Sequence, residues 1–240
     1  MSQFEKLFTE LFRKNSLENY IRNDTVEKFE KLTEIMIRTN AVMNITALTT
    51  IEKIIPLHYA DCVKIADRIP EGATVIDVGC GGGFPILPLA IVRPDLKITG
   101  LDSTDKKVRY VQSTADKLGL KISTISARAE DAAKTPQYRD SFDVAISRAV
   151  ARMNLLDELC MPFVKIDGVF IAMKGAAGQE ELEEAKNGIQ RLGGQITDAE
   201  EYNLYTGLEE EKRTVIEIRK VTATPKEFPR GFGAIKKKPL

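Results

Sequence analysis

The stretch TVIDVGCGGGFPILPLAIVRP, residues 74–94, joins an apolar β-rich run to an apolar helical run through four glycines in five positions. A glycine turn of this kind binds phosphate in two common motifs. The P-loop needs a lysine and a hydroxyl residue directly after its last glycine, and here no lysine occurs before Lys97. The dinucleotide motif GxGxxG, counted from Gly79 and Gly81, needs a third glycine where this chain has Phe84. Both phosphate motifs, and with them an NAD-dependent dehydrogenase, are therefore disfavoured.

A carboxylate follows at the end of the next predicted strand. Asp102 lies 23 positions after Gly79, where a carboxylate can accept both hydroxyls of a ribose. The pattern therefore predicts a bound nucleoside without a pyrophosphate, and S-adenosylmethionine is the common cofactor of that description. The alternative is a tight turn that serves packing alone. It is weaker because four glycines cost more chain entropy than a simple turn requires.

Beyond this turn, short β-branched runs alternate with helical windows. The predicted strands span residues 74–79, 97–102, 121–126, 142–148, 168–175, 193–204 and 212–220. Strands that alternate with helices imply right-handed crossovers and a mainly parallel sheet. Only a short loop separates the last two runs, so we expect them to form an antiparallel hairpin at the end of the sheet. The predicted fold class is α/β, with a mostly parallel seven-stranded sheet, a C-terminal antiparallel hairpin and an N-terminal helical cap.

Two further segments flank the sheet, which we expect to occupy residues 71–220. Residues 1–70 have apolar residues at helical spacing and predict a helical cap. Within this cap, a helix from about residue 51 to 69 is expected to break near Pro56. Residues 221–240 are rich in proline, glycine and lysine and lack periodicity, which predicts a disordered basic tail.

The composition excludes several classes of protein. Lys plus Arg and Asp plus Glu number 35 each, so any basic site must be local. The three cysteines form no CxxC pair and favour a reducing compartment. The chain shows neither the apolar core of a signal peptide nor a run that could span a bilayer. A single histidine, His58, makes a multi-histidine metal site impossible. We therefore expect a cytoplasmic protein with no membrane association and no metal, and a monomer, because no apolar stripe remains once the core is assigned.

Several longer motifs occur together and are far more specific than the glycine pattern. They are NAVMNITAL, HYADC, VIDVGCGGGFPILPLAIVRPD, LDSTDKKVRYVQ, ARAED, FDVAISRAVA and MKG, in this order between about residues 20 and 220. With them the chain closely resembles the bacterial small-subunit ribosomal RNA guanine-N7 methyltransferases, the RsmG or glucose-inhibited division protein B family. The resemblance implies a class I S-adenosylmethionine-dependent methyltransferase fold, which is Rossmann-like. It also implies methylation of N7 of a guanine near the decoding region of 16S ribosomal RNA, with that RNA or the small ribosomal subunit as partner.

The same resemblance assigns roles to individual residues. Those assigned to the cofactor are Gly79, Gly81 and Phe84 along its methionine and adenosine, Asp102 at its ribose, and Ala129 and Glu130 at its adenine. Arg148 would lie where the cofactor and the target base meet, and it is also assigned to the cofactor. Arg148 and Arg128 are the candidate catalytic residues.

Guanine N7 carries an in-plane lone pair, so its methylation requires no general base. The enzyme has to align the nitrogen, the methyl group and the leaving sulfur. A guanidinium pointing at N7 would oppose the positive charge that develops there. We therefore assign Arg128, Arg148 and Arg213 to O6 or to phosphates. The alternative is a surface ion pair with Glu130 or Glu210.

The remaining candidates lie on the cap and the tail. His58 and Asp61 are three residues apart on a predicted helix, a spacing that allows a hydrogen bond between them. The favoured role is a structural clasp between cap and sheet and the alternative is a catalytic role, with His58 also a candidate contact to the RNA. The one clearly basic cluster, a plausible grip on RNA, contains Lys236, Lys237 and Lys238. Two alternatives stay open: a methyltransferase for a protein or small molecule, and a non-catalytic nucleoside- or RNA-binding protein. The exact nucleotide and the choice between free RNA and a subunit particle also stay open.

Overall fold

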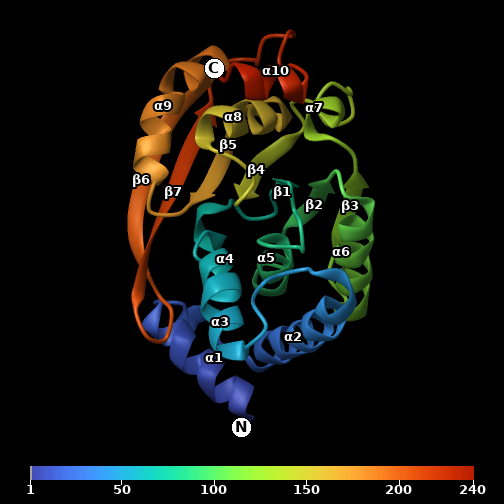
Figure 1. Ribbon diagram of the computed structural model, residues 1–240, viewed down its shortest axis with the longest axis vertical. Helices are drawn as coiled ribbons and strands as arrows, with labels where there is room; N and C mark the ends of the chain where they lie inside the picture. Colours follow the sequence, from blue (N-terminus) through green and yellow to red (C-terminus); the bar gives the residue numbers. More distant parts are fainter. Residues whose placement is uncertain (1) are drawn as a thin grey trace.

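The computed structural model describes residues 2–240 and contains one seven-stranded sheet (Figure 1). Its strands are β1 (Thr74–Val78), β2 (Lys97–Asp102), β3 (Ile122–Ser126), β4 (Phe142–Arg148), β5 (Val164–Lys174), β6 (Gly194–Tyr205) and β7 (Glu210–Lys220). Their order is β3-β2-β1-β4-β5-β7-β6. All neighbours are parallel except β7, which is antiparallel to both β5 and β6. The predicted parallel sheet with a terminal antiparallel hairpin is therefore confirmed.

The central strand β1 is apolar because both faces of the sheet are covered. Val75 to Val78 are all buried, as expected for a parallel strand between two helical layers. In register, Asp77 lies opposite Gly100 on β2 and Ile146 on β4. The carboxyl ends of these three strands therefore meet at one edge, where open α/β sheets bind their ligands.

Two groups of helices cover the sheet. One face carries α5 (Ile86–Val92), α6 (Asp105–Leu118) and the N-terminal helices, while the other carries α7 (Ala129–Ala132), α8 (Met153–Cys160) and α9 (Gly178–Arg191). Successive strand residues point to opposite faces of the sheet. Val75 packs in the hydrophobic cluster with α5, α6 and the N-terminal helices, and Ile76 packs in the cluster with α7, α8 and α9. Every residue of α5 is buried, which explains its lack of a polar stripe.

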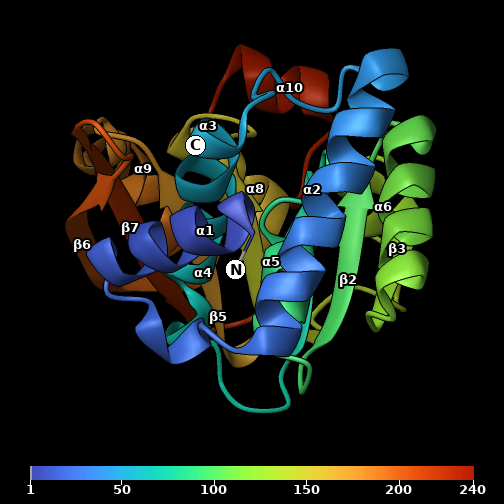
Figure 2. The ribbon, with the colours of Figure 1, turned by 90° about the horizontal axis from the view of Figure 1, so that it is seen from below.

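The N-terminal cap consists of α1 (Gln3–Lys14), α2 (Asn23–Met43), α3 (Ile51–Ile54) and α4 (Asp61–Val63). Its helix α2 packs against α5 and α6, as Figure 2 shows from below. The expected break near Pro56 takes the form of a change in helix type, because α3 ends at Ile54 and a π-helical turn over Ile55–Ala60 joins it to α4. Pro56 stands at the start of this π-helical turn, where its missing N–H removes the hydrogen bond that would have continued α3.

The prediction of a disordered tail is wrong. Residues 221–240 contain a helix, α10 (Phe232–Lys237), that lies against α8 (Figure 1). Phe228 and Ile235 are 4% and 0% exposed and belong to the hydrophobic cluster beneath α8. The segment is held by a few separate buried residues, such as Phe228 and Ile235, and not by a continuous apolar stripe. Its sequence therefore shows no periodic pattern from which an ordered structure could be predicted.

Candidate functional site

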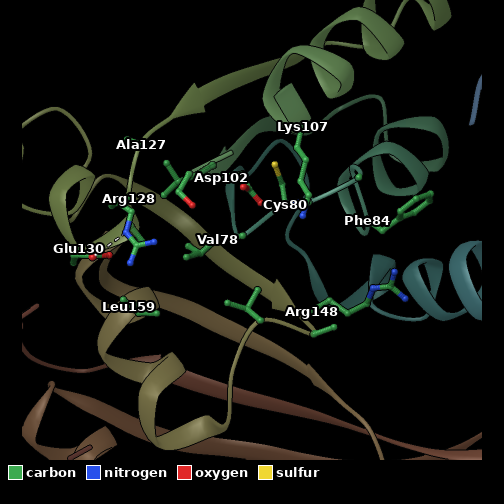
Figure 3. Close-up of a pocket in the computed structure, with 18 of the residues that line it drawn as sticks. Val78, Cys80, Phe84, Asp102, Lys107, Ala127, Arg128, Glu130, Arg148 and Leu159 are labelled. Atoms are coloured by element: carbon green, nitrogen blue, oxygen red, sulfur yellow. Dashed lines mark hydrogen bonds and ion pairs between the residues drawn. The ribbon is translucent and has the colours of Figure 1, made fainter. Parts of the chain in front are cut away.

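A cavity of about 480 Å³ opens at the carboxyl ends of β1, β2 and β4. It brings together most of the residues predicted for the site, namely His58, Gly79, Gly81, Phe84, Asp102, Arg128, Ala129, Glu130 and Arg148. Figure 3 shows Arg128, Glu130 and Leu159 at one end, the Arg128 end, and Phe84 and Arg148 at the other, the Arg148 end. Asp102 lies between the two ends.

The glycine turn forms the floor of this cavity with bare backbone. Gly79 and Gly81 have φ angles of +82° and +53°, which L side chains rarely adopt. The amides of Gly79 and Cys80 both donate to the carbonyl of Leu101, at 2.8 and 2.9 Å. A Cβ on Gly79 would come within 2.5 Å of Cγ2 of Val150, another cavity residue. Glycine therefore leaves open a space that any side chain would fill.

The Asp102 carboxylate is fixed at the end of β2. Its Oδ2 accepts from the amide of Gly81 at 3.0 Å and its Oδ1 accepts from the amide of Thr104 at 2.8 Å. A carboxylate has about four acceptor positions, so these two bonds leave capacity for the hydroxyls of a ligand.

At the Arg128 end, charge and apolar surface lie side by side. Nε of Arg128 is 3.2 Å from Oε1 of Glu130, which is 7% exposed. The guanidinium of Arg128 also stacks over the Phe232 ring of α10, 4.9 Å from its centroid. Leu159 of α8 completes this end. A flat apolar ring with polar edges fits such surroundings.

At the Arg148 end, His58 stacks on Phe84 with centroids 4.2 Å apart and planes inclined by 8°. Nη2 of Arg148 donates to Nδ1 of His58 at 3.1 Å, and Nε2 of His58 lies 2.8 Å from Oγ1 of Thr46. Because a guanidinium only donates, Nδ1 must accept, and Nε2 then carries the proton toward Thr46. Burial, followed by the charge of Arg148, lowers the pKa of His58 to about 3. The imidazole is therefore neutral.

The hydrogen bond that the spacing of His58 and Asp61 allows is not formed, because Arg148 of β4 lies between the two. Asp61 accepts from Nη1 of Arg148 at 2.9 Å and from the hydroxyl of Tyr202 at 3.1 Å. Nε of Arg213 lies 3.4 Å from the same carboxylate. Arg148 thus links the N-terminal cap to the sheet.

Arg213 lies outside the first cavity. It pairs with Glu211 at 2.8 Å instead of the predicted Glu210, because residues two apart on a strand point to the same face. Arg213 lines a second cavity of about 320 Å³, which shares Arg148 and Ala149 with the first.

Lys236, Lys237 and Lys238 lie on or just after α10, exposed and outside both cavities.

S-adenosylmethionine fits the first cavity. Asp77, directly behind the glycine turn, is fully buried, and neither of its carboxylate oxygens has a hydrogen-bond partner. Burial raises the pKa of Asp77 well above its ordinary value. A positive charge beside Asp77 would favour its ionised form, and the cofactor carries an ammonium and a sulfonium. The orphaned carboxylate, the open glycine floor and the free acceptor positions of Asp102 all suit such a ligand.

Phe232 is the main cavity residue that the sequence predictions missed. The only local signal for it was the pair Phe232 and Ile235, spaced as on one face of a short helix. The residues between 2 and 240 contain no cluster of three His, Cys, Asp or Glu able to hold a metal ion. In the same part of the chain, no helix is long and apolar enough to cross a membrane.

Comparisons with known proteins point to one family. The family model described as "rRNA small subunit methyltransferase G" (GidB) matches residues 25–205. The protein named "Ribosomal RNA small subunit methyltransferase G" from Clostridium perfringens (strain 13 / Type A) is 46% identical over 192 residues, 79% of this chain and 80% of the relative. The protein of the same name from Oceanobacillus iheyensis is 43% identical over 192 residues, again 79% of this chain and 80% of the relative.

A solved structure resembles the fold. The structure of M. jannaschii TYW2 in complex with AdoMet aligns with a TM-score of 0.57 and 16% identity, over 75% of this chain and 80% of that one. At this identity the likeness shows the shared fold alone, and the family rests on the sequence relatives. The chain therefore belongs to the rRNA small subunit methyltransferase G family and is an S-adenosylmethionine-dependent methyltransferase of ribosomal RNA.

Proposed function

We propose that this enzyme methylates N7 of a single guanine near the decoding region of 16S ribosomal RNA. When bound, S-adenosylmethionine supplies an electrophilic methyl group on its sulfonium. The observation that carries the choice of N7 is the state of the acid and base groups around the first cavity. His58 is neutral with both ring nitrogens engaged, Asp102 accepts two backbone amides, and Glu130 is paired with Arg128. The free acceptor positions of Asp102 are assigned to the ribose of the cofactor, so no carboxylate or imidazole among the described residues that line this cavity is left to remove a proton. In the second cavity, Asp61 is paired with Arg148 and Glu181 with Lys174. An acceptor such as guanine N7, which brings its own lone pair, suits this arrangement.

The proposed cofactor contacts follow the length of the cavity. We assign Gly79, Gly81 and Asp102 to the methionine and ribose, because they supply open backbone and a fixed carboxylate. Ala129 and Glu130 receive the adenine at the Arg128 end.

Phe84 supports the Arg148 end through its stack with His58, while the Arg148 guanidinium lies 5.8 Å from its centroid. This support holds the guanidinium of Arg148 at the boundary between the two cavities.

We assign the second cavity to the target guanine. Because Arg148 and Ala149 line both cavities, a base in the second would meet the methyl donor at this boundary. Arg148 and Arg213 would then donate to O6 or to a phosphate, since a cation at N7 opposes the charge formed on methylation. Arg128 is half exposed and is assigned to a backbone phosphate near the cavity mouth.

The remaining assignments concern the surface. The exposed Lys236, Lys237 and Lys238 would contact the RNA backbone of the small subunit, a contact that weakens with salt. We propose that residues 71–220 form the catalytic unit, that residues 1–70 and 221–240 extend it, and that a monomer acts on the RNA in the cytoplasm.

The test is transfer of labelled methyl from S-adenosylmethionine to small-subunit RNA that lacks the modification. Borohydride and aniline then cleave the RNA wherever 7-methylguanine has formed. A single cleavage near the decoding region supports the proposal. Labelled RNA that resists cleavage contradicts the N7 assignment, and labelling elsewhere contradicts the site. Parallel reactions with free RNA and with subunit particles identify the substrate form.

A further inference from the structure

One wall of the first cavity comes from a segment that the family model does not reach. The model matches residues 25–205, whereas Phe232 of α10 lines the cavity at its Arg128 end. The helix α10 lies against α8, next to α7, as Figure 1 shows. The ring of Phe232 faces the guanidinium of Arg128, 4.9 Å from its centroid. This aromatic side chain therefore reaches the site from the last ten residues of the chain.

The segment is fixed on the N-terminal side of Phe232 by a buried ion pair. Glu158 of α8 is fully buried, and Arg230 donates to it from its amide at 2.7 Å, from Nε at 2.9 and 3.1 Å and from Nη2 at 2.6 Å. A buried carboxylate is stable only when it is paired and hydrogen-bonded, so this contact selects one position for the segment.

Further anchors lie on both sides of the ring. Before it, Phe228 is 4% exposed, and Arg139 donates to its carbonyl at 2.8 Å and to that of Thr224 at 2.8 Å. After it, Ile235 is fully buried in the cluster beneath α8. A segment anchored at both ends holds the ring between them, which a free tail would not do.

We propose that residues 228–240 form a strap that closes the Arg128 end of the cofactor cavity, and that Phe232 is a cofactor-binding residue that packs against the adenine. The inference rests on the proposed position of the adenine beside Ala129 and Glu130. Between the Phe232 ring and Leu159, a flat purine finds apolar surface, while the backbone and Glu130 meet its polar edge. If the strap contacts the cofactor, then the cofactor stabilises the strap by the same coupling free energy.

The first experiment measures S-adenosylhomocysteine and adenosine binding by calorimetry, in the full-length protein without RNA. Phe232→Ala is expected to weaken both ligands at least tenfold, and Phe232→Tyr to restore most of the affinity. Lys226→Ala, at an exposed position just before the strap, is the matched control and should change binding less than twofold. Melting temperatures without ligand verify that each variant is folded.

The outcomes separate the strap from the cofactor site itself. Wild-type affinity in Phe232→Ala overturns the proposal while the cofactor assignment stands. A loss for S-adenosylhomocysteine with unchanged adenosine binding also overturns it, because the ring would then contact the methionine end. If the wild-type protein binds neither ligand, the proposed cofactor site fails before the strap is considered.

The second experiment follows tryptic cleavage after Lys236 and Lys237. S-adenosylhomocysteine at saturation is expected to slow this cleavage at least fivefold in the wild type and to protect Phe232→Ala much less. Equal cleavage rates with and without ligand in the wild type would contradict a strap that contacts the cofactor.

Discussion

Arg148 donates a hydrogen bond to Nδ1 of His58 at 3.1 Å, so a residue at the end of β4 determines which ring nitrogen carries the proton in the only histidine, 90 positions earlier in the chain. The neutral ring then lies flat on Phe84, and the second ring nitrogen meets Thr46. The structure thus favours the clasp role for His58, because the imidazole joins the cap to the sheet edge and exposes no free nitrogen to a substrate. The consequences can be measured as stability against pH.

We expect the fold to lose stability in acid through His58. Its folded pKa of about 3 lies below the ordinary 6.5, so the unfolded chain binds the proton first as the pH falls. The stabilising effect is therefore complete above pH 6.5 and is lost between pH 6.5 and 3, by about 2 to 3 kcal/mol at pH 4.5. His58→Asn keeps an acceptor for Arg148 but removes the titrating group. Between pH 7.5 and 4.5 its free energy of unfolding should fall by about 2 to 3 kcal/mol less than that of the wild type. Urea titrations at both pH values measure it.

The same residue gives a test of function. His58→Ala is expected to lower the melting temperature and still methylate RNA. An inactive variant that is folded at the assay temperature would argue against the clasp role.

Arg148 is expected to matter far more for methyl transfer. Arg148→Ala leaves the buried Asp61 with one guanidinium fewer, which should destabilise the fold by about 3 kcal/mol or more. Arg148→Lys keeps the charge but loses the fork that reaches His58 and Asp61 together, so a rate loss of roughly 100-fold is expected. Cofactor affinity should fall by a smaller factor than the rate, because Arg148 lines both cavities and its proposed hydrogen bonds go to the acceptor guanine.

The matched control is Arg152→Lys, since Arg152 is about half exposed and pairs with Glu180 and Glu184 at the surface. Its rate should equal that of the wild type. If Arg148→Lys transfers methyl groups at the wild-type rate, the role proposed for Arg148 in methyl transfer is wrong.

The sheet was predictable because its information is local. Each strand showed its own β-branched run, and the short loop between the last two runs was enough to predict the hairpin. The glycine turn was equally legible, since positive φ at Gly79 and Gly81 limits the residue types that fit there.

Contacts between distant segments were not predictable in the same way. A spacing of three residues correctly places His58 and Asp61 near one another, but no local pattern reveals that Arg148 bridges them. Likewise, the order of the C-terminal segment depends on Glu158, 72 positions before Arg230. Such pairings follow from the assembled fold, and periodicity carries no information about them.

Gly79→Ala tests the open floor of the cofactor cavity, with Gly119→Ala as its control. Both positions have positive φ, so both variants should lose about 1 to 2 kcal/mol of stability from backbone strain. Only at residue 79 does the new methyl group meet a cavity residue, Val150, whereas the space beside Gly119 is open. S-adenosylhomocysteine binding should therefore weaken at least tenfold in Gly79→Ala and stay within twofold in Gly119→Ala. An equal change of S-adenosylhomocysteine affinity in the two variants would show that Gly79 serves the fold and not the cofactor cavity.

Asp157, next to the anchor of the strap, should give the opposite pH dependence. Its Oδ1 accepts from the amide of Glu158 at 2.6 Å, while its Oδ2 is buried without a partner. Burial raises its pKa from 3.8 to about 7, and the charge of Glu158 adds to this, whereas those of Arg230 and Lys174 oppose it. The folded state therefore keeps a proton that the unfolded chain releases near pH 3.8. Its contribution makes the free energy of unfolding fall as the pH rises from 3.8 to 7, and the full cost remains above pH 7.

Asp157→Asn removes this cost, because the amide oxygen can still accept from Glu158 and no charge is buried. At pH 8 the variant should be more stable than the wild type by about 4 kcal/mol, and at pH 4 the two should be nearly equal. Glu158→Gln is the comparison: its carboxylate is paired with Arg230, so this variant should be less stable than the wild type at pH 8. Urea unfolding at the two pH values distinguishes these cases. The prediction fails if the stability difference between Asp157→Asn and the wild type is the same at pH 8 as at pH 4. That result would show that the buried acid is already solvated or paired and that the cost assigned to it is wrong.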